Sequence, residues 1–171
     1  MTDWFTEDYR GEYRTSIRVD RTLHRSESAF QTIDVFEAPY FGKVLALGGF
    51  FQTSTADEHH YHEMIVHPAM VIAPRIRRVL VIGGGDGGTA REVLRYPGVE
   101  RCVMVEIDRA VVDACRAHMP ELSAGAFDDP RLELRFEDGV RYVAEADVAP
   151  FDVLILDGSD PLGPSEGLFE S

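Results

Sequence analysis

The stretch VLVIGGGDGGTAREVL (Val79 to Leu94) decides the fold, because an apolar run, a glycine-rich turn and a helical pattern follow one another within it. Gly83, Gly85 and Gly88 satisfy the spacing G-x-G-x-x-G directly after the apolar run. A turn of this kind binds adenosine cofactors, usually with phosphate groups on its backbone N–H groups. Asp86 stands in the middle of the turn, where its carboxylate would repel a pyrophosphate. The turn therefore predicts an adenosine compound without phosphate, although Asp86 also suits a helix cap.

Apolar strands and helical patterns alternate on both sides of this turn. We expect strands over residues 77–83, 101–108, 131–138 and 151–158, and helices over residues 88–96, 109–119 and 139–146. A further helix over residues 57–74 is predicted to kink at Pro68 and to end at Pro74. Alternation of this kind indicates βαβ crossovers and a parallel sheet. An open sheet usually has more strands, so the chain is expected to be the front part of a longer protein.

The first third of the chain has a different pattern. Apolar runs over residues 31–38, 42–47 and 50–55, separated by turn residues, predict an antiparallel meander, with an earlier strand within residues 13–28. The predicted class is therefore α/β. A small antiparallel β domain over residues 1–56 precedes a Rossmann-like sheet of the class I methyltransferase type over residues 57–171, truncated after its fourth strand.

Composition and net charge indicate which classes of binding partner are expected. With 44% hydrophobic and 10% aromatic residues among 171, the chain is typical of a globular protein. Its 17 basic and 30 acidic residues give a net charge of −13, which disfavours nucleic acid and anionic membranes and suits a small cation, or simply aids solubility. Cys102 and Cys115 are predicted to be buried thiols. No targeting segment is recognised, so a cytoplasmic location is expected.

Acidic residues follow the predicted strands of the parallel sheet. Besides Asp86 in the turn, these are Glu106, Asp138 and Asp157. At Asp138 the alternative is a helix cap, and at Asp157 and Asp160 it is a turn of Asp and Pro residues. Because ligands bind beyond the carboxyl ends of parallel strands, the four acids are expected to converge on one anionic pocket. Such a pocket suits a cationic cofactor, a cationic substrate, or both.

The sequence resembles the spermidine synthases, which are polyamine aminopropyltransferases, over nearly its whole length. The resemblance rests on WFTE, QTIDVFEAPYFGKVLAL, YHEMIVHP, VLVIGGGDGGTAREVL, VEID, EDG and DGSDPLGPSEGLF, in that order. It implies transfer of an aminopropyl group from decarboxylated S-adenosylmethionine, a co-substrate, to putrescine or a related amine. The other product would be 5′-methylthioadenosine. No metal and no tightly bound cofactor are implied, and a homodimer or homotetramer is expected, or a C-terminal fragment that completes the sheet.

The resemblance also implies roles for single residues. Those implied for the co-substrate are Gln31, Asp86, Glu106, Asp138, Gly139 and Pro164. Among these, Glu106 would bind the ribose hydroxyls, Asp138 the adenine amine and Asp86 the ammonium of the tail. Those implied for the amine substrate are Tyr61, His62, Asp157, Gly158, Ser159 and Asp160. Asp157 would be the proton acceptor, with Tyr61 as the second catalytic residue.

Departures from the family pattern keep alternatives open. Gly158 replaces a serine beside the base, Gly48 replaces an acid, and Thr55-Ala56 replaces a Glu-Arg pair. One alternative is methyl transfer from intact S-adenosylmethionine, whose carboxylate would lie badly against Asp86. Another is a non-catalytic fragment that binds ligand or oligomerises. A metal on His59 and Glu63 is a weaker alternative to a His62 that lines the substrate site. The length of the acceptor and the size of the oligomer stay open.

Overall fold

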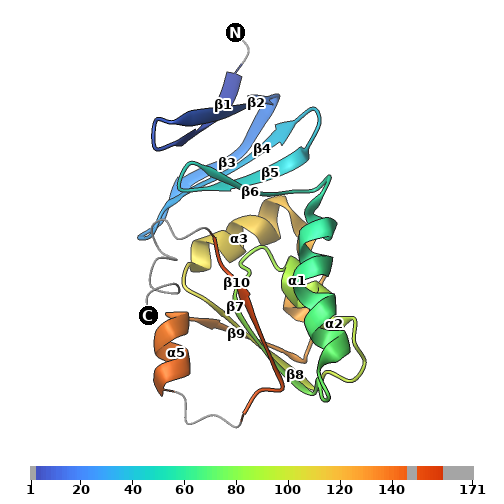
Figure 1. Cartoon of the computed structure of the whole chain (residues 1–171). Coiled ribbons are helices and arrows are strands. Elements are labelled where there is room, and N and C mark those ends of the chain that lie inside the picture. The colour runs from blue at the N-terminus through green and yellow to red at the C-terminus, as the bar shows by residue number, and fades with distance from the viewer. Residues whose placement is uncertain (1–2, 146–149, 160–171) are drawn as a thin grey trace.

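Antiparallel strands form the N-terminal part of the computed structural model, which describes residues 3–145 and 150–159 (Figure 1). Strands β1 (Asp3–Tyr9) and β2 (Tyr13–Val19) make a hairpin. Strands β3 (Arg21–Glu27), β4 (Thr32–Ala38), β5 (Gly42–Leu47) and β6 (Phe50–Ser54) pair in sequential order as a meander. The N-terminal β region predicted from the sequence is confirmed.

The rest of the described chain is a parallel sheet with helices. Its strands are β7 (Arg78–Gly83), β8 (Arg101–Glu106), β9 (Leu132–Phe136) and β10 (Val153–Asp157), in the order β10-β7-β8-β9. The helices are α1 (Glu58–Ile72), α2 (Gly88–Leu94), α3 (Arg109–His118), α4 (Pro120–Ser123) and α5 (Gly139–Glu145), with a 3₁₀ turn η1 (Ala126–Asp128). The predicted α/β class, a parallel sheet preceded by an antiparallel β domain, is therefore confirmed.

Both faces of the central strands are covered, which explains their unbroken apolar sequences. On β7, Val79 and Val81 belong to the core shared with α1 and α2. Leu80 and Ile82 point to the opposite face, where Tyr142 of α5 packs. On β10 only one face is buried, because Leu154 is 56% exposed.

A separate apolar cluster joins the two parts of the chain. Ile33 and Val35 of β4 and Leu45 of β5 pack against residues of α3 and α4, including Val111 and Leu122. Burying this apolar surface holds the antiparallel sheet beside the parallel one. The meander consequently lies over the end of the molecule towards which β10 runs (Figure 1).

Some elements differ from the expectations. Helix α1 ends at Ile72, before Pro74 as expected, and does not restart at Pro68, whereas the short α4 and η1 were not anticipated. Cys102 and Cys115 are free and buried, as predicted. Within residues 3–145 and 150–159, no helix combines the length and apolar character needed to cross a bilayer.

Candidate active site

The turn between β7 and α2 is closely packed against functional side chains. Gly84 has a φ of +77° and its N–H donates to the backbone oxygen of Asp157 at 2.9 Å. A Cβ on Gly84 would lie 2.9 Å from Asp157 Oδ2, and one on Gly88 would lie 2.3 Å from the His62 ring. The glycines thus make room for a carboxylate and an imidazole of the protein itself.

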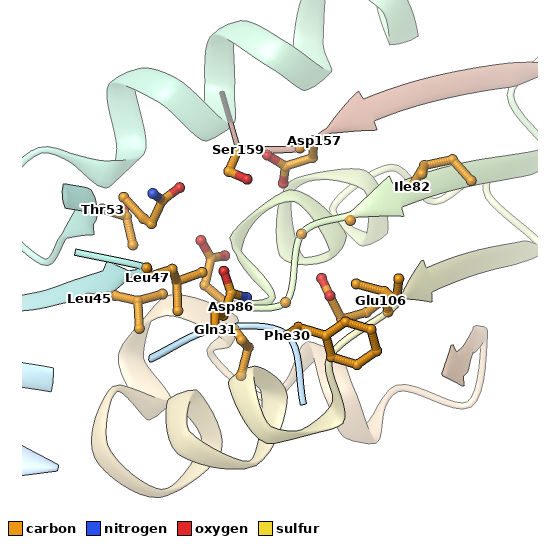
Figure 2. A pocket seen from close by; sticks show the side chains of 18 of the residues that line it. Phe30, Gln31, Leu45, Leu47, Thr53, Ile82, Asp86, Glu106, Asp157 and Ser159 are labelled. Carbon is orange, nitrogen blue, oxygen red and sulfur yellow. The ribbon is translucent and has the colours of Figure 1, made fainter. Parts of the chain in front are cut away.

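A cavity of about 540 Å³ lies beside this turn (Figure 2). The residues singled out in the sequence that line it are Gln31, Tyr61, Asp86, Glu106, Asp138, Gly139, Asp157, Gly158 and Ser159. Asp160 and Pro164, also singled out, lie outside the described residues. The four acids at the strand ends therefore share one cavity.

Glu106 is the most deeply buried of these acids. It ends β8 with 8% of its surface exposed, and its Oε1 accepts a hydrogen bond from Asp108 N at 2.9 Å. Burial, reinforced by the nearby charges of Asp108 and Asp157, raises the pKa of Glu106 to about 7 against the lowering effect of backbone N–H donors. Near neutral pH the carboxyl group is therefore close to half ionised, and groups that donate hydrogen bonds favour its charged form.

Asp157 and Tyr61 form a pair at the end of β10. Tyr61 of α1 donates its hydroxyl hydrogen to Asp157 Oδ1 at 2.7 Å. Burial, followed by the charge of Asp86, raises the pKa of Asp157 above its ordinary value. Burial, followed by the Asp157 charge, likewise raises the pKa of Tyr61, so the phenol stays protonated at neutral pH. The pair thus offers a relatively basic carboxylate held by a neutral hydrogen-bond donor.

Asp86 combines the two functions considered from the sequence. Its Oδ1 accepts a hydrogen bond from Gly88 N, the first residue of α2, at 2.6 Å. The same side chain lines the cavity (Figure 2). Gly87 is the N-cap residue of α2, so Asp86 stands one position before it and still satisfies the first N–H of the helix while it lines the cavity.

His62 lies behind the cavity wall, which differs from the position expected from the sequence. Its side chain is 0% exposed and does not line the cavity. Nδ1 lies 2.5 Å from Glu58 Oε2, and Nε2 lies 3.3 Å from Asp86 Oδ1. The reason is geometric, because neighbouring positions on a helix point in different directions, and Tyr61 takes the outer one. In the described geometry His62 is therefore not among the residues that line the cavity.

The meander supplies a wall of the cavity that sequence reasoning largely missed. Its apolar and polar contributors, beyond Gln31, are Phe30, Leu45, Leu47, Gly48, Phe50, Phe51, Gln52 and Thr53, and the neighbouring hairpin adds Glu7 of β1. Figure 2 shows Leu45, Leu47 and Thr53 across the cavity from Asp157. Gly48, one of the departures from the family pattern, is among the lining residues. No local motif marks this wall, because it exists only once the two sheets pack together.

Asp138 and Gln31 complete the predicted set. Asp138 Oδ1 accepts a hydrogen bond from Arg141 N at 3.0 Å, so this acid caps α5 and also lines the cavity. Gln31 Nε2 donates to Asp108 Oδ2 at 3.4 Å, which ties the turn before β4 to the end of β8. Sequence reasoning assigned no role to Asp108, although this residue lies only two positions after Glu106.

A second group of acids and histidine lies outside the cavity. Glu63, His67 and Glu92 place ligand-type atoms within 4.8 Å of one another. However, Glu92 already binds Arg91 at 2.9 Å and Arg95 at 2.7 Å. We therefore interpret this group as an ion-pair network between α1 and α2.

Comparison with known families identifies the chain. Residues 58–171 match the family model described as "Spermine/spermidine synthase domain". The chain belongs to the spermine/spermidine synthase family. Residues 3–55 match a second model of this family, described as "Spermidine synthase tetramerisation domain". The resemblance inferred from the sequence is confirmed.

Individual relatives agree with the family. The chain is 48% identical to the polyamine aminopropyltransferase of Clostridium perfringens over 99% of its own length and 59% of that protein. It is 48% identical to the enzyme of the same name from Prochlorococcus marinus, over 97% of the chain and 57% of that protein. The chain thus spans less than two thirds of the length of these relatives.

Solved structures show the same fold. A crystal structure of spermidine synthase in complex with the transition state analogue AdoDATO matches with a TM-score of 0.93 and 40% identity, covering 98% of this chain and 57% of that one. Spermidine synthase from Thermotoga maritima matches with a TM-score of 0.87 and 41% identity, covering 91% of this chain and 54% of that one. These comparisons give no support to the methyltransferase or the non-catalytic alternative.

Proposed function

We propose that the protein transfers the aminopropyl group of decarboxylated S-adenosylmethionine to putrescine or a related amine and releases 5′-methylthioadenosine. The observation that carries the proposal is the sharing of one cavity by Asp86, Glu106, Asp138 and Asp157 in a chain of this family. A carboxylate about 4 Å from a unit positive charge gains roughly 4 kcal/mol at an effective dielectric constant near 20, before desolvation. The same carboxylates would repel a phosphate. The cavity therefore suits a sulfonium, an ammonium, or both.

The residue roles that we propose are those implied by the resemblance to the family, and the positions of the described groups are compatible with them. Glu106, deep at the end of β8, binds the ribose hydroxyls, and Asp138 with Gly139 binds the adenine at the start of α5. Gln31 closes the nucleoside side, and Asp86 binds the ammonium of the aminopropyl tail. The remaining proposed contacts are Pro164 for the co-substrate and Gly158, Ser159 and Asp160 for the amine.

The reaction requires an unprotonated amine. For an amine with a lysine-like pKa near 10.4, deprotonation at pH 7 costs about 4–5 kcal/mol. The nitrogen lone pair forms a bond to the methylene carbon beside sulfur while the C–S bond breaks. The electron pair of the broken C–S bond stays on sulfur, and the sulfonium becomes a neutral thioether. Asp157 accepts the proton that the nitrogen loses, and Tyr61 holds the carboxylate in place from 2.7 Å. Holding both reactants in line supplies much of the remaining rate enhancement.

One experiment tests this function. The protein, in the form in which its own cells produce it, is incubated with decarboxylated or intact S-adenosylmethionine and a panel of diamines and monoamines. The products are analysed by mass spectrometry. Aminopropylated amine together with 5′-methylthioadenosine is the expected result. Methylated amine formed from intact S-adenosylmethionine, or no product with any pair, would contradict the proposal.

The organisation of the molecule supports three further proposals. Residues 1–56 and 57–171 act as an assembly domain and a catalytic domain. The first domain mediates a homotetramer, in line with its match to a tetramerisation model. A cytoplasmic location is supported by the two free, buried cysteines, Cys102 and Cys115, which suit a reducing compartment.

A further inference from the structure

A row of alternating charges leads from the interior to the cavity. Arg91 of α2 donates two hydrogen bonds to Glu58, at 3.0 Å to Oε1 and 2.9 Å to Oε2. Glu58 Oε2 faces His62 Nδ1 at 2.5 Å, and His62 Nε2 lies 3.3 Å from Asp86 Oδ1. Arg91 is fixed in turn by the backbone oxygen of Leu122, at 2.6 Å. The row is therefore anchored at its inner end and reaches the cavity through Asp86.

The position of the His62 ring makes its protonation state important. Each ring nitrogen faces a carboxylate, and Nε2 has no hydrogen-bond partner of good geometry within the described part of the chain. A neutral imidazole would present one bare lone pair to a carboxylate, whereas the cation presents an N–H on both sides. The ring cannot move away easily, because Gly88 packs so closely on it that a Cβ there would overlap.

The charged and titratable groups around the ring favour the cation. They are Glu58 and Tyr61 of α1, Asp86 of the turn, Arg91 of α2 and Asp157 of β10. Burial alone lowers the pKa of His62, but the carboxylates of Asp86 and Glu58, with Asp157, raise it to about 9. Arg91 lies on the far side of Glu58 and neutralises part of the charge of the Glu58 carboxylate. Within the described part of the chain, no hydrogen bond joins Arg91 to the His62 ring.

We infer that Glu58 is a positioning residue that keeps His62 a cation, that Arg91 holds Glu58 in place, and that the His62 cation orients Asp86 to receive the ammonium of the co-substrate tail. The inference deepens the proposed function and rests on it for the identity of the ligand. Asp86 uses Oδ1 for both His62 and Gly88 N, so Oδ2 is the oxygen that serves the cavity. In the described geometry His62 faces Asp86 and is not among the residues that line the cavity, so its effect on the tail is argued through Asp86.

The first test needs no ligand. The ring protons of His62 are followed by NMR in the ligand-free protein across neutral and alkaline pH. His62 is expected to remain protonated up to about pH 9, in line with its contacts. In Glu58→Gln the amide is neutral, so the midpoint is expected to fall by about one unit or more. An ordinary midpoint near 6.5 in the unmodified protein, or an unchanged midpoint in the variant, would overturn the inference.

The second test compares two ligands that differ in the charged tail. Dissociation constants for decarboxylated S-adenosylmethionine and 5′-methylthioadenosine are measured by calorimetry at about pH 8.5 and about pH 6. In Glu58→Gln, the tailed ligand is expected to bind about tenfold more weakly at the higher pH, with 5′-methylthioadenosine nearly unchanged. The loss should shrink at the lower pH, where His62 regains its proton.

A matched control lies on the same helix. Glu63→Gln makes the identical change at a 48% exposed side chain whose described ion pair is with Arg95, and neither ligand should be affected. Equal weakening of both ligands in Glu58→Gln, or a loss that is independent of pH, would show a purely structural effect and overturn the inference. Failure of the unmodified protein to bind either ligand would instead count against the proposed function, and the NMR titration would still decide the state of His62.

Discussion

Two carboxylates of the cavity have different chemistry because their surroundings differ. Glu106 is held by a backbone N–H and buried at a strand end, whereas Asp157 is held by a phenol and faces Asp86. Both have raised pKa values, but the donor that holds Asp157 is a side-chain phenol, whereas the donor that holds Glu106 is a backbone N–H. A raised pKa strengthens a base, so Asp157 is suited to accept a proton from an amine. Glu106 is suited to bind hydroxyl groups.

Replacing Asp157 by asparagine is expected to remove the base while keeping the shape of the site. The amide still accepts the Tyr61 hydrogen bond, but it does not take up a proton at neutral pH. Turnover should fall by about 10²–10⁴-fold, with 5′-methylthioadenosine affinity within a few-fold of the unmodified protein. Steady-state kinetics and calorimetry measure the two effects. Asp128→Asn, at an 83% exposed side chain outside the cavity, is the control. Near-normal turnover in Asp157→Asn would show that another group is the base.

The pKa of Glu106 predicts proton release when the nucleoside binds. The free carboxyl, with a pKa of about 7, is partly protonated near neutral pH, and ribose hydroxyls donate stronger hydrogen bonds to its charged form than to its neutral form. Affinity for 5′-methylthioadenosine should therefore rise between about pH 6 and about pH 8. Calorimetry in buffers with different ionisation enthalpies should detect release of a fraction of a proton. Glu106→Gln should bind weakly and independently of pH. Proton uptake on binding would contradict the assignment.

At the scale of elements, local patterns predicted most of the parallel sheet and its helices. The runs at β7 and β8 are apolar on both faces, and capping residues such as Asp108 mark helix starts. The hairpin β1–β2 was harder to predict, because its strands are largely exposed and carry polar residues such as Asp8 and Arg14. Pro68 was expected to kink or restart α1. The helix does not restart there, because Pro68 lies on the exposed side and packing of Val66 and Met70 maintains the helix.

The site was predictable only in part for a similar reason. Sequence patterns located the acids at the strand ends, because chain direction fixes which edge of the sheet they occupy. They did not locate the wall supplied by the meander, or show that His62 faces inward. Those features depend on how α1 and the meander pack, which no local pattern encodes.

The turn between β7 and α2 provides the prediction at this scale. Gly84→Ala combines a positive φ of +77° with a Cβ placed 2.9 Å from Asp157 Oδ2. Gly125→Ala is the matched control, because its φ is +88° and nothing lies within 4 Å of the added atom. We expect the control to lose about 1 kcal/mol of unfolding free energy and Gly84→Ala to lose about 2–4 kcal/mol. Denaturant unfolding measures both, and turnover should fall only for Gly84→Ala. Equal losses would show that backbone strain alone explains the glycine.

At the scale of the whole molecule, negative charge is concentrated where the ligand would bind. The net charge of −13 includes the five acids that line the cavity, Glu7, Asp86, Glu106, Asp138 and Asp157, and their charged forms repel one another without a cation. Ligand binding and folding are therefore coupled through the same groups. A cationic ligand relieves this repulsion, whereas an increase in pH strengthens it.

The free protein should consequently become less stable as pH rises from about 6 to about 9. His62 has a folded pKa of about 9, above its unfolded value, so its stabilising contribution is complete below about 6.5 and is lost as pH approaches 9. Glu106, with a folded pKa of about 7, also binds more protons when folded than when unfolded between about pH 4.5 and 7. Since the folded state binds more protons, the unfolding free energy falls as pH rises, by about 3 kcal/mol for a shift of 2–3 units in a single buried group.

Denaturant unfolding at several pH values measures the trend. His62→Asn should be less stable at pH 6 but flatter towards pH 9. A stability that increases with pH in the unmodified protein would show that these two groups do not carry the raised pKa values on which the mechanism depends.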